Sequence, residues 1–168
     1  PVDLARGVFT LTWKEATRIN WGIILLFGGG LAFGDLMMKT GLSQAVGEGF
    51  VTLFGVTTVW GLTAIAIVAG VVVSELASNT ASASLLVPVV ISIAQAAEIS
   101  AVPPGLGACL GASLGFALPV STPPNAIVYD TGLVPMKSMV RTGVLFDLLG
   151  AVLIWIALRI LCPLVGLT

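Results

Sequence analysis

The sequence predicts an all-α integral membrane protein. Of its 168 residues, 57% are hydrophobic and 9% are charged, whereas soluble domains carry about 25% charged residues. Uncharged runs cover residues 49–74, 76–97 and 99–129. Each run is long enough to cross a bilayer core, which takes about 20 helical residues. The sequence shows no sustained alternation of apolar and polar residues, so we expect the spans to be helices and not strands of a barrel.

The composition also argues against several classes of function. The net charge is −1 and the chain has no basic patch, so we expect no nucleic-acid partner. It contains no His, the commonest general base and metal ligand. No Ser–Lys or Asp pair stands at helical spacing, so an intramembrane enzyme is disfavoured. We expect a multi-pass protein of the cell (inner or plasma) membrane that is not an enzyme.

Residues 1–20 are expected to form an interfacial amphipathic helix and a linker. Thr12 and Glu15 have the spacing of a capping box at the start of a helix. Trp13 and Trp21 would lie at the depth of the lipid headgroups. The chain begins with Pro and not Met, and this charged linker resembles the middle of a protein. We therefore expect the chain to be one part of a longer protein.

Residues 21–53 are expected to hold a transmembrane helix, from about Trp21 to Met38, and a link outside the membrane. The three glycines at 28–30 lower helix propensity in water, but in a membrane they allow close packing of backbones. Gly41 follows the expected end of this helix.

Residues 54–98 are expected to form a helical hairpin whose arms meet at a polar turn around Asn79. Two topologies fit: two full crossings with a turn in water, or a re-entrant hairpin whose turn stops inside the bilayer. The segment 77–82 contains no Lys, Arg, Gly or Pro, which exposed loops usually carry. That composition favours the re-entrant hairpin.

Residues 104–138 are expected to form a transmembrane helix that is broken at its prolines, which are Pro119, Pro123 and Pro124. A proline lacks the N–H that would bond the carbonyl four residues back. The carbonyls of Gly115, Pro119 and Val120 therefore lose their helical donors. An unsatisfied carbonyl in hydrocarbon costs several kcal/mol, so the broken backbone is expected to line a polar cavity or to face an ion.

Residues 139–168 are expected to form the last transmembrane helix, in which Asp147 and Arg159 would face other helices or the interface. Five of the seven Lys and Arg residues fall on one side if one crossing precedes the hairpin and one follows it; they are Arg6, Lys14, Arg18, Lys137 and Arg141. The positive-inside rule makes that side cytoplasmic. The hairpin would then enter the membrane from the outer face.

The hairpin turn and the proline break share one chemistry, because both offer hydroxyls, carboxamides and free carbonyls. Neutral oxygen atoms of this kind suit a hard monovalent cation such as Na+. Helices that begin at the two breaks also present free N–H groups, which bind anions. No Lys or Arg occurs between Lys39 and Lys137, so the charge of an anion bound here must be balanced by co-bound cations, helix dipoles or residues from elsewhere.

Glu75 is the one acid beside the turn. We weigh three roles for it: an acceptor for nearby N–H groups, a contributor to the field of a cation site, and a proton carrier. The polar turn also has a purely structural interpretation, hydrogen bonding between helices of a packed bundle. Two separate breaks at comparable depth are hard to explain by packing, so a binding site is favoured.

Two motifs resemble those of a known family. Residues 74–82 read Ser-Glu-Leu-Ala-Ser-Asn-Thr-Ala-Ser, and residues 118–128 read Leu-Pro-Val-Ser-Thr-Pro-Pro-Asn-Ala-Ile-Val. They are similar to the Ser-Asn-Thr hairpin and the Thr-Pro-Pro-Asn unwound helix of the divalent anion/sodium symporters (the DASS family, solute carrier family 13). Residues 11–16 and 21–31 look like the family's interfacial helix and its next span. The resemblance covers nearly the whole chain, in order.

The resemblance implies a homodimeric elevator-type transporter, with a scaffold domain at the dimer interface and a transport domain built from inverted repeats. Each repeat supplies one Ser-Asn-Thr hairpin and one broken helix, and this chain has one of each. The chain is therefore expected to be the C-terminal inverted repeat, partnered by the N-terminal portion of the transporter. Its helix within residues 21–53 would lie on the scaffold side.

The resemblance also implies the residues of a sodium site and of a substrate site. The sodium site would use Ser74, Ala77, Asn79 and Ser121, several through backbone carbonyls. The carboxylate contacts would come from Ser78, Asn79, Thr80, Thr122 and Pro123. In the family Ala is often found at the position of Ser121, so the hydroxyl here could alter ion preference or substrate fit.

The function that the resemblance implies is sodium-coupled symport of di- or tricarboxylates such as succinate, malate or citrate. Na+ would be the co-transported ion, and no covalent chemistry is expected. Two alternatives stay open. One is a proton-coupled or sulfate-type anion transporter of the same fold, and the other is a structural membrane subunit whose polar turn is dry and internally satisfied.

Overall fold

The computed structural model describes residues 12–17, 21–42, 45, 49 and 58–167. Every regular element in these ranges is a helix, as the composition predicts. The elements are α1 (Trp13–Ala16), α2 (Trp21–Lys39), α4 (Val59–Leu76), α5 (Asn79–Ala96), α6 (Val102–Gly111), α7 (Pro123–Asp130) and α8 (Met136–Leu164). The predicted linker before Thr12 and most of the predicted link before the hairpin lie outside these ranges.

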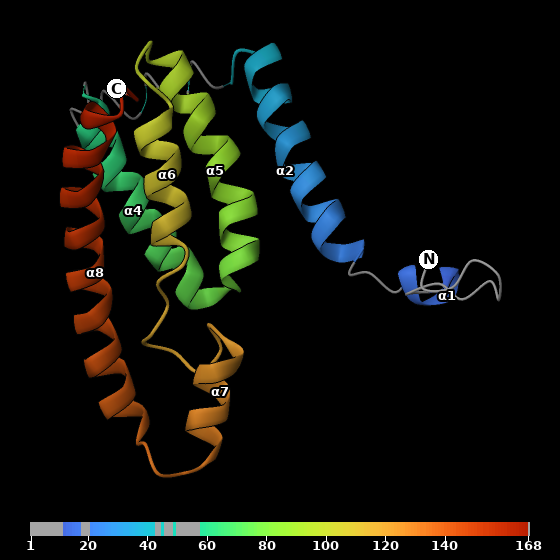
Figure 1. Cartoon of the computed structure of the whole chain (residues 1–168), viewed down its shortest axis with the longest axis vertical. Coiled ribbons are helices and arrows are strands. Elements are labelled where there is room, and N and C mark those ends of the chain that lie inside the picture. Colours follow the sequence, from blue (N-terminus) through green and yellow to red (C-terminus); the bar gives the residue numbers. More distant parts are fainter. Residues whose placement is uncertain (1–11, 18–20, 43–44, 46–48, 50–57, 168) are drawn as a thin grey trace, which may run out of the picture.

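Four helices make the bundle that positions the polar residues. In Figure 1, α4, α5, α6 and α8 stand side by side, and α2 lies against α5. The single turn of α1 lies away from the bundle, near the N-terminus. Beyond the hairpin turn, α7 stands beside the lower half of α8.

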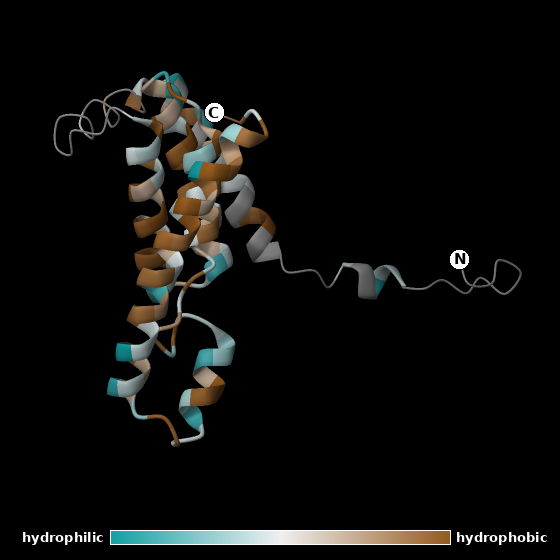
Figure 2. Ribbon diagram, turned by 60° about the vertical axis from the view of Figure 1, so that its left-hand side comes forward, coloured by the Kyte–Doolittle hydropathy of each residue, from teal (hydrophilic) through white to brown (hydrophobic). Residues whose placement is uncertain are grey.

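Three helices of the described structure are long and apolar enough to cross a bilayer, namely α4, α5 and α8. The first two have 18 residues each and α8 has 29. At 1.5 Å per residue, α8 is roughly 43 Å long and exceeds the hydrocarbon thickness of about 30 Å. The large apolar side chains exposed on α8 give it a hydrophobic outer surface, with hydrophilic residues at the end beside α7 (Figure 2).

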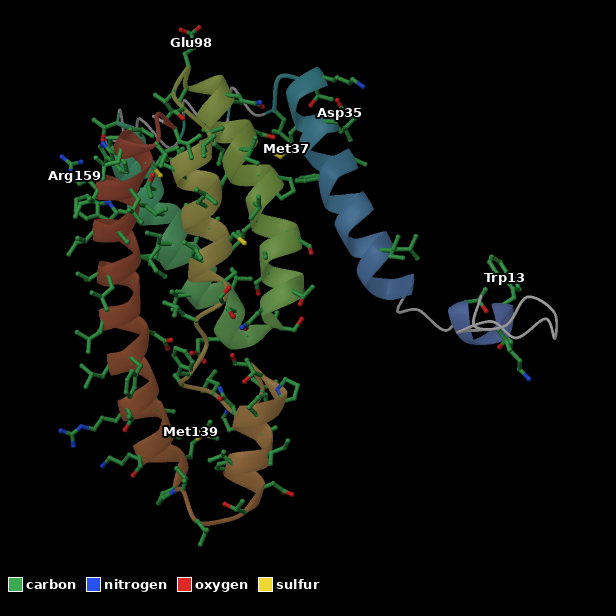
Figure 3. The ribbon with its side chains drawn as sticks, viewed as in Figure 1. Trp13, Asp35, Met37, Glu98, Met139 and Arg159 are labelled. Carbon is green, nitrogen blue, oxygen red and sulfur yellow. The ribbon has the colours of Figure 1, made fainter. Side chains whose placement is uncertain are left out.

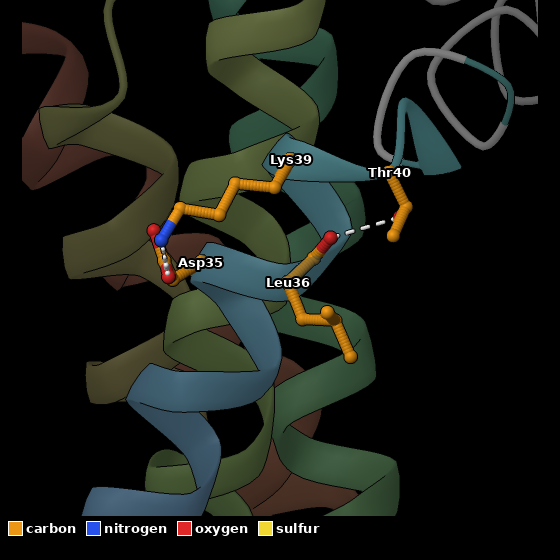
Figure 4. A network of polar contacts seen from close by, with 4 residues as sticks. All are labelled: Asp35, Leu36, Lys39 and Thr40. Atoms are coloured by element: carbon orange, nitrogen blue, oxygen red, sulfur yellow. Dashed lines mark hydrogen bonds and ion pairs between the residues drawn. The ribbon is translucent and has the colours of Figure 1, made fainter.

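The end of α2 is fixed by local polar contacts. Lys39 Nζ lies 2.6 Å from Asp35 Oδ2, and the Thr40 hydroxyl donates to the Leu36 carbonyl at 2.8 Å (Figure 4). Gly41 then turns the chain with a φ of +75°. The predicted end of this helix is therefore confirmed, whereas its place as a further membrane span stays a prediction.

The helices α4 and α5 form a hairpin in which Ala77 and Ser78 alone separate the two arms. Thr58 caps the start of α4, because its hydroxyl accepts from the Gly61 N–H at 3.1 Å. Ser78 caps the start of α5 in the same way, accepting from the Ala81 N–H at 3.3 Å. The short turn keeps the arms in contact, so the polar residues on either side of it are held together.

Close backbone contact between α4 and α6 depends on glycine. A Cβ atom on Gly70 would lie 2.7 Å from both Ala108 O and Ala112 N, and one on Gly111 would meet the Ile67 backbone. Ala66 of α4 and Ala108 of α6 pack together with Val90 of α5, and two further buried clusters contain Leu62, Ile93 and Ala94, and Ile67, Leu158 and Cys162. The position of α6 therefore depends on these glycines.

The substitution Gly70→Ala is expected to lower the free energy of unfolding by about 1–3 kcal/mol, because overpacking forces the backbones apart. Gly105→Ala on α6 is the matched control, since its new Cβ would meet only Ile91 side-chain atoms at 3.4 Å or more. Thermal unfolding in detergent should show a lower Tm for the first variant alone. Equal Tm values would contradict the close crossing.

The broken helix differs from its prediction in where it breaks. We expected the interruption at Pro119, Pro123 and Pro124, but α6 already ends at Gly111 and the helix resumes only at Pro123. Hairpin side chains bind the carbonyls of Ala112 and Ser113, and these carbonyls therefore leave the helix before the first proline is reached. The prolines prevent the helix from continuing, and the tertiary contacts determine the residue at which it ends.

Arg159 contacts its neighbours as the sequence suggests. Its guanidinium lies 5.3 Å from the ring centres of Trp60 and Trp155, and the Trp155 indole donates to the Trp60 carbonyl at 3.0 Å. Figure 3 places Arg159 at the same end of the bundle as Glu98, away from Met139. Cation–π contacts of this kind join the start of α4 to the last turns of α8.

Candidate functional site

Hydrogen bonds from Ser74 and Asn79 join the hairpin turn to residues 112–122, which we call the unwound segment. The Ser74 hydroxyl lies 2.8 Å from the Ala112 carbonyl oxygen and 2.6 Å from Asn79 Oδ1. Asn79 Nδ2 donates to the Ser113 carbonyl at 3.2 Å. The two polar regions that the sequence singles out are therefore in direct contact.

The cluster around Ser74 has more acceptors than protons. A hydroxyl carries one proton, yet Ser74 Oγ is close to two acceptor oxygens, those of Asn79 and Ala112. Ser74 is fully buried, at 0% exposure. One proton cannot serve both acceptors at once. A group of oxygen atoms with too few protons to pair them is a suitable ligand set for a hard cation.

Gly115 in the unwound segment lies next to these oxygens. The point where a Cβ atom would stand on this residue is closest to Ser121 Oγ, 3.0 Å from Ser74 Oγ and 3.4 Å from Asn79 Oδ1. Its φ of +156° is one that L side chains rarely adopt. Side-chain oxygens of three predicted sodium residues thus converge beside Gly115, where a larger residue would collide with them.

Ala77, the fourth predicted sodium residue, ends α4. It is extended, with φ −139° and ψ 170°, and its N–H bonds the Val73 carbonyl. Its own carbonyl therefore lies outside the hydrogen-bond pattern of the helix. The geometry suits a backbone oxygen ligand, which is the role that the family resemblance implies.

Side chains bind the Gly115 carbonyl, one of the three that the prolines leave without a helical donor. The Gly115 carbonyl accepts from the Ser121 hydroxyl and from Asn125 Nδ2, each at 2.8 Å. Asn125 also donates to the Leu118 carbonyl at 3.1 Å. Asn125 is absent from the predicted site list, although its position after two prolines could have indicated a capping role.

Glu75 binds the backbone of the unwound segment. Its Oε1 and Oε2 accept from the N–H groups of Ala117 and Leu118, each at 2.8 Å. Of the three roles that the sequence allows, this geometry agrees with the first, an acceptor for nearby N–H groups. Glu75 therefore fixes the unwound segment to the end of α4.

The five predicted substrate residues lie at two helix N-termini. Ser78 caps α5 and Thr122 caps α7, its hydroxyl accepting from the Asn125 N–H at 3.4 Å. Asn79 and Thr80 open α5, and Pro123 opens α7. Ser78, Thr80 and Pro123 are exposed, whereas Asn79 and Thr122 are partly buried. The N–H groups of Asn79 and Thr80 at the start of α5 can bind an anion. The expected free N–H groups at the start of α7 are absent, because Pro123 and Pro124 have no N–H and the Asn125 N–H is bound by Thr122.

Comparisons with known proteins show the family of this chain. A family model described as the sodium:sulfate symporter transmembrane region matches residues 5–167. The sodium-dependent dicarboxylate transporter SdcS of Staphylococcus saprophyticus is 33% identical over 153 residues, which are 91% of this chain and 29% of that protein. An uncharacterized transporter of Haemophilus influenzae is 38% identical over 146 residues, 85% of this chain and 31% of that protein.

The helices and these matches define a piece of a multi-pass membrane transporter. The chain belongs to the divalent anion/sodium symporter family, as the two sequence motifs indicate. It spans 29% to 31% of the length of these two relatives. The family is one of transporters, so the expected class of function is transport and not catalysis.

Proposed function

We propose that this chain is the C-terminal portion of a sodium-coupled symporter of the cell membrane for di- or tricarboxylates of the succinate, malate and citrate class. The observation that carries the proposal is the convergence of Ser74, Asn79 and Ser121 oxygens beside Gly115. A relative that covers most of the chain is a sodium-dependent dicarboxylate transporter, which favours the same ion and substrate class.

Na+ is proposed to bind beside Gly115. Its ligands would be the side-chain oxygens of Ser74, Asn79 and Ser121 and the carbonyl of Ala77, which has left its helix. Because these ligands come from the hairpin and from the unwound segment, a bound ion would hold the two together. Ion binding would thereby complete the surface on which the substrate docks.

The carboxylate is proposed to bind at the N-termini of α5 and α7, on Ser78, Asn79, Thr80, Thr122 and Pro123. The sequence between Lys39 and Lys137 contains no Lys or Arg. The negative charge of the substrate must therefore be balanced by Na+, by helix dipoles or by residues outside this chain. That requirement is the physical basis for coupling the anion to the cation.

The elevator mechanism, the re-entrant hairpin and the homodimer belong to the same proposal. Figure 1 shows the hairpin turn level with the middle of α8, which continues past it. If α8 crosses the bilayer, a turn level with its middle lies inside the hydrocarbon, and this depth supports re-entry even though α4 and α5 are themselves long enough to cross. The N-terminal portion of the transporter would supply the second repeat and the other half of the substrate site.

Uptake of labelled succinate into proteoliposomes that contain the complete transporter tests the proposal. We expect uptake to require an inward Na+ gradient and to stop when K+ replaces Na+. Uptake that follows a pH gradient without Na+ would favour the proton-coupled alternative, and labelled sulfate taken up in place of succinate would favour the sulfate-type one. No uptake of any of these anions would favour a structural subunit.

A further inference from the structure

One face of α8 is shaped to fit the unwound segment. Gly143, Asp147 and Gly150 have spacings of four and three residues, so they lie on the same side of the helix. A Cβ atom on Gly143 would collide with the Ala117 backbone, and one on Gly150 would lie 2.9 Å from a Leu114 methyl carbon. Asp147 stands between these two close contacts.

Asp147 presents its carboxyl group to the backbone of the same segment. The side chain is buried, at 5% exposure, and Oδ1 accepts from the Phe116 N–H at 3.4 Å. It also contacts the Gly115 N–H and the Glu75 carboxyl group. The next N–H groups along the chain, at Ala117 and Leu118, bind Glu75. Two helices therefore hold consecutive N–H groups of the segment next to Gly115.

We propose that Asp147 is a positioning residue of the cation site, acting through the Phe116 N–H. Phe116 directly follows Gly115, so a hydrogen bond to its N–H fixes where the Gly115 backbone lies relative to the oxygens of Ser74 and Asn79. The inference rests on the proposed function, because it assigns to α8 the task of holding a segment that binds Na+. Asp147 would touch neither the ion nor the substrate.

The role requires a hydrogen-bond acceptor and not a negative charge. An Asn side chain keeps an acceptor oxygen for the Phe116 N–H and adds an N–H that can donate to the Glu75 carboxyl group. Asp147→Asn should therefore preserve the site. Asp147→Ala removes the acceptor, leaves a buried N–H without its partner and frees the segment next to Gly115.

The test compares these two variants in the complete transporter. Asp147→Ala should raise the Na+ concentration for half-maximal uptake about tenfold or more, as is typical when a supporting contact of a metal site is lost. The uptake rate at saturating Na+ should fall much less. Asp147→Asn should remain within about twofold of wild type for both quantities. Leu149→Ala, on the exposed side of α8, is the matched control.

A second measurement separates positioning from simple destabilisation. Na+ should raise the Tm of the wild-type protein and of Asp147→Asn, and the rise should be smaller in Asp147→Ala at equal Na+ concentration. A lower Tm with an unchanged Na+-induced rise would overturn the inference, and so would an Asn variant as impaired as the Ala variant. A wild-type protein without any Na+ response would instead overturn the proposed function.

Discussion

The substitution Gly115→Ala is expected to raise the Na+ concentration for half-maximal uptake by at least about 100-fold in the complete transporter. The new methyl group would occupy the point that lies between Ser121, Ser74 and Asn79 oxygens, and an L residue would also be strained at a φ of +156°. Overpacking and backbone strain each cost about 1–3 kcal/mol, and a loss of about 3 kcal/mol corresponds to more than 100-fold in affinity. Na+ titration of succinate uptake measures the effect.

Ser121→Ala provides the control for this variant. This substitution removes the atom closest to the new methyl group. The double variant Gly115→Ala/Ser121→Ala therefore relieves that clash but keeps the methyl group beside the Ser74 and Asn79 oxygens. We expect Ser121→Ala alone to keep Na+-dependent uptake with a lower apparent affinity for Na+, because the proposed ligands from Ser74, Ala77 and Asn79 remain. The double variant should stay defective. If the double variant recovered Na+ affinity, the defect of Gly115→Ala would come from the clash with Ser121 and not from a methyl group that occupies the proposed Na+ position.

The substitution Asn79→Ala should lower the apparent affinity for Na+ by roughly 10-fold to 150-fold, because an oxygen that faces a charge is worth about 1.5–3 kcal/mol. The variant loses the contact to Ser74 and the hydrogen bond to the Ser113 carbonyl, so the hairpin turn also comes away from the unwound segment. Succinate affinity should fall with it. Na+ and succinate titrations of uptake measure the two effects separately.

Ser84→Ala is the matched control for Asn79→Ala. Ser84 is a buried polar residue of the same helix, but its hydroxyl donates to the Thr80 carbonyl within that helix at 2.7 Å. Its loss should change neither titration by more than about twofold, because the hydroxyl and the carbonyl belong to one local pair. Equal effects of the two substitutions would show that the site has been placed wrongly.

Local rules were enough to predict most of the helices. The polar turn between two apolar runs predicted the hairpin, and Ser78 and Thr122 cap the helices that begin at the two breaks. The prolines predicted a break and a free Gly115 carbonyl, which is indeed bound by side chains. These features depend on a few neighbouring residues, and the sequence shows them directly.

The parts that sequence analysis missed depend on contacts between distant residues. The end of α6 at Gly111 follows from the hairpin side chains that bind the Ala112 and Ser113 carbonyls. Asp147 is one acid in an apolar helix, and only the approach of α8 to the unwound segment shows what it binds. The sequence indicates a role for the Gly115 carbonyl only. The absence of a side chain on Gly115 matters because the oxygens of Ser74, Asn79 and Ser121 lie beside it, and only the structure shows this.

Equilibrium binding of labelled Na+ to the purified complete transporter tests the central claim most directly. The wild-type protein and Gly115→Ala would be compared, with Gly105→Ala as a variant whose new methyl group makes only ordinary contacts. At the Na+ concentration that just saturates the wild-type protein, our account predicts that Gly115→Ala binds about one fewer Na+ per protomer, while Gly105→Ala matches wild type. An unchanged number of bound Na+ in Gly115→Ala at that concentration would contradict a cation site beside Gly115.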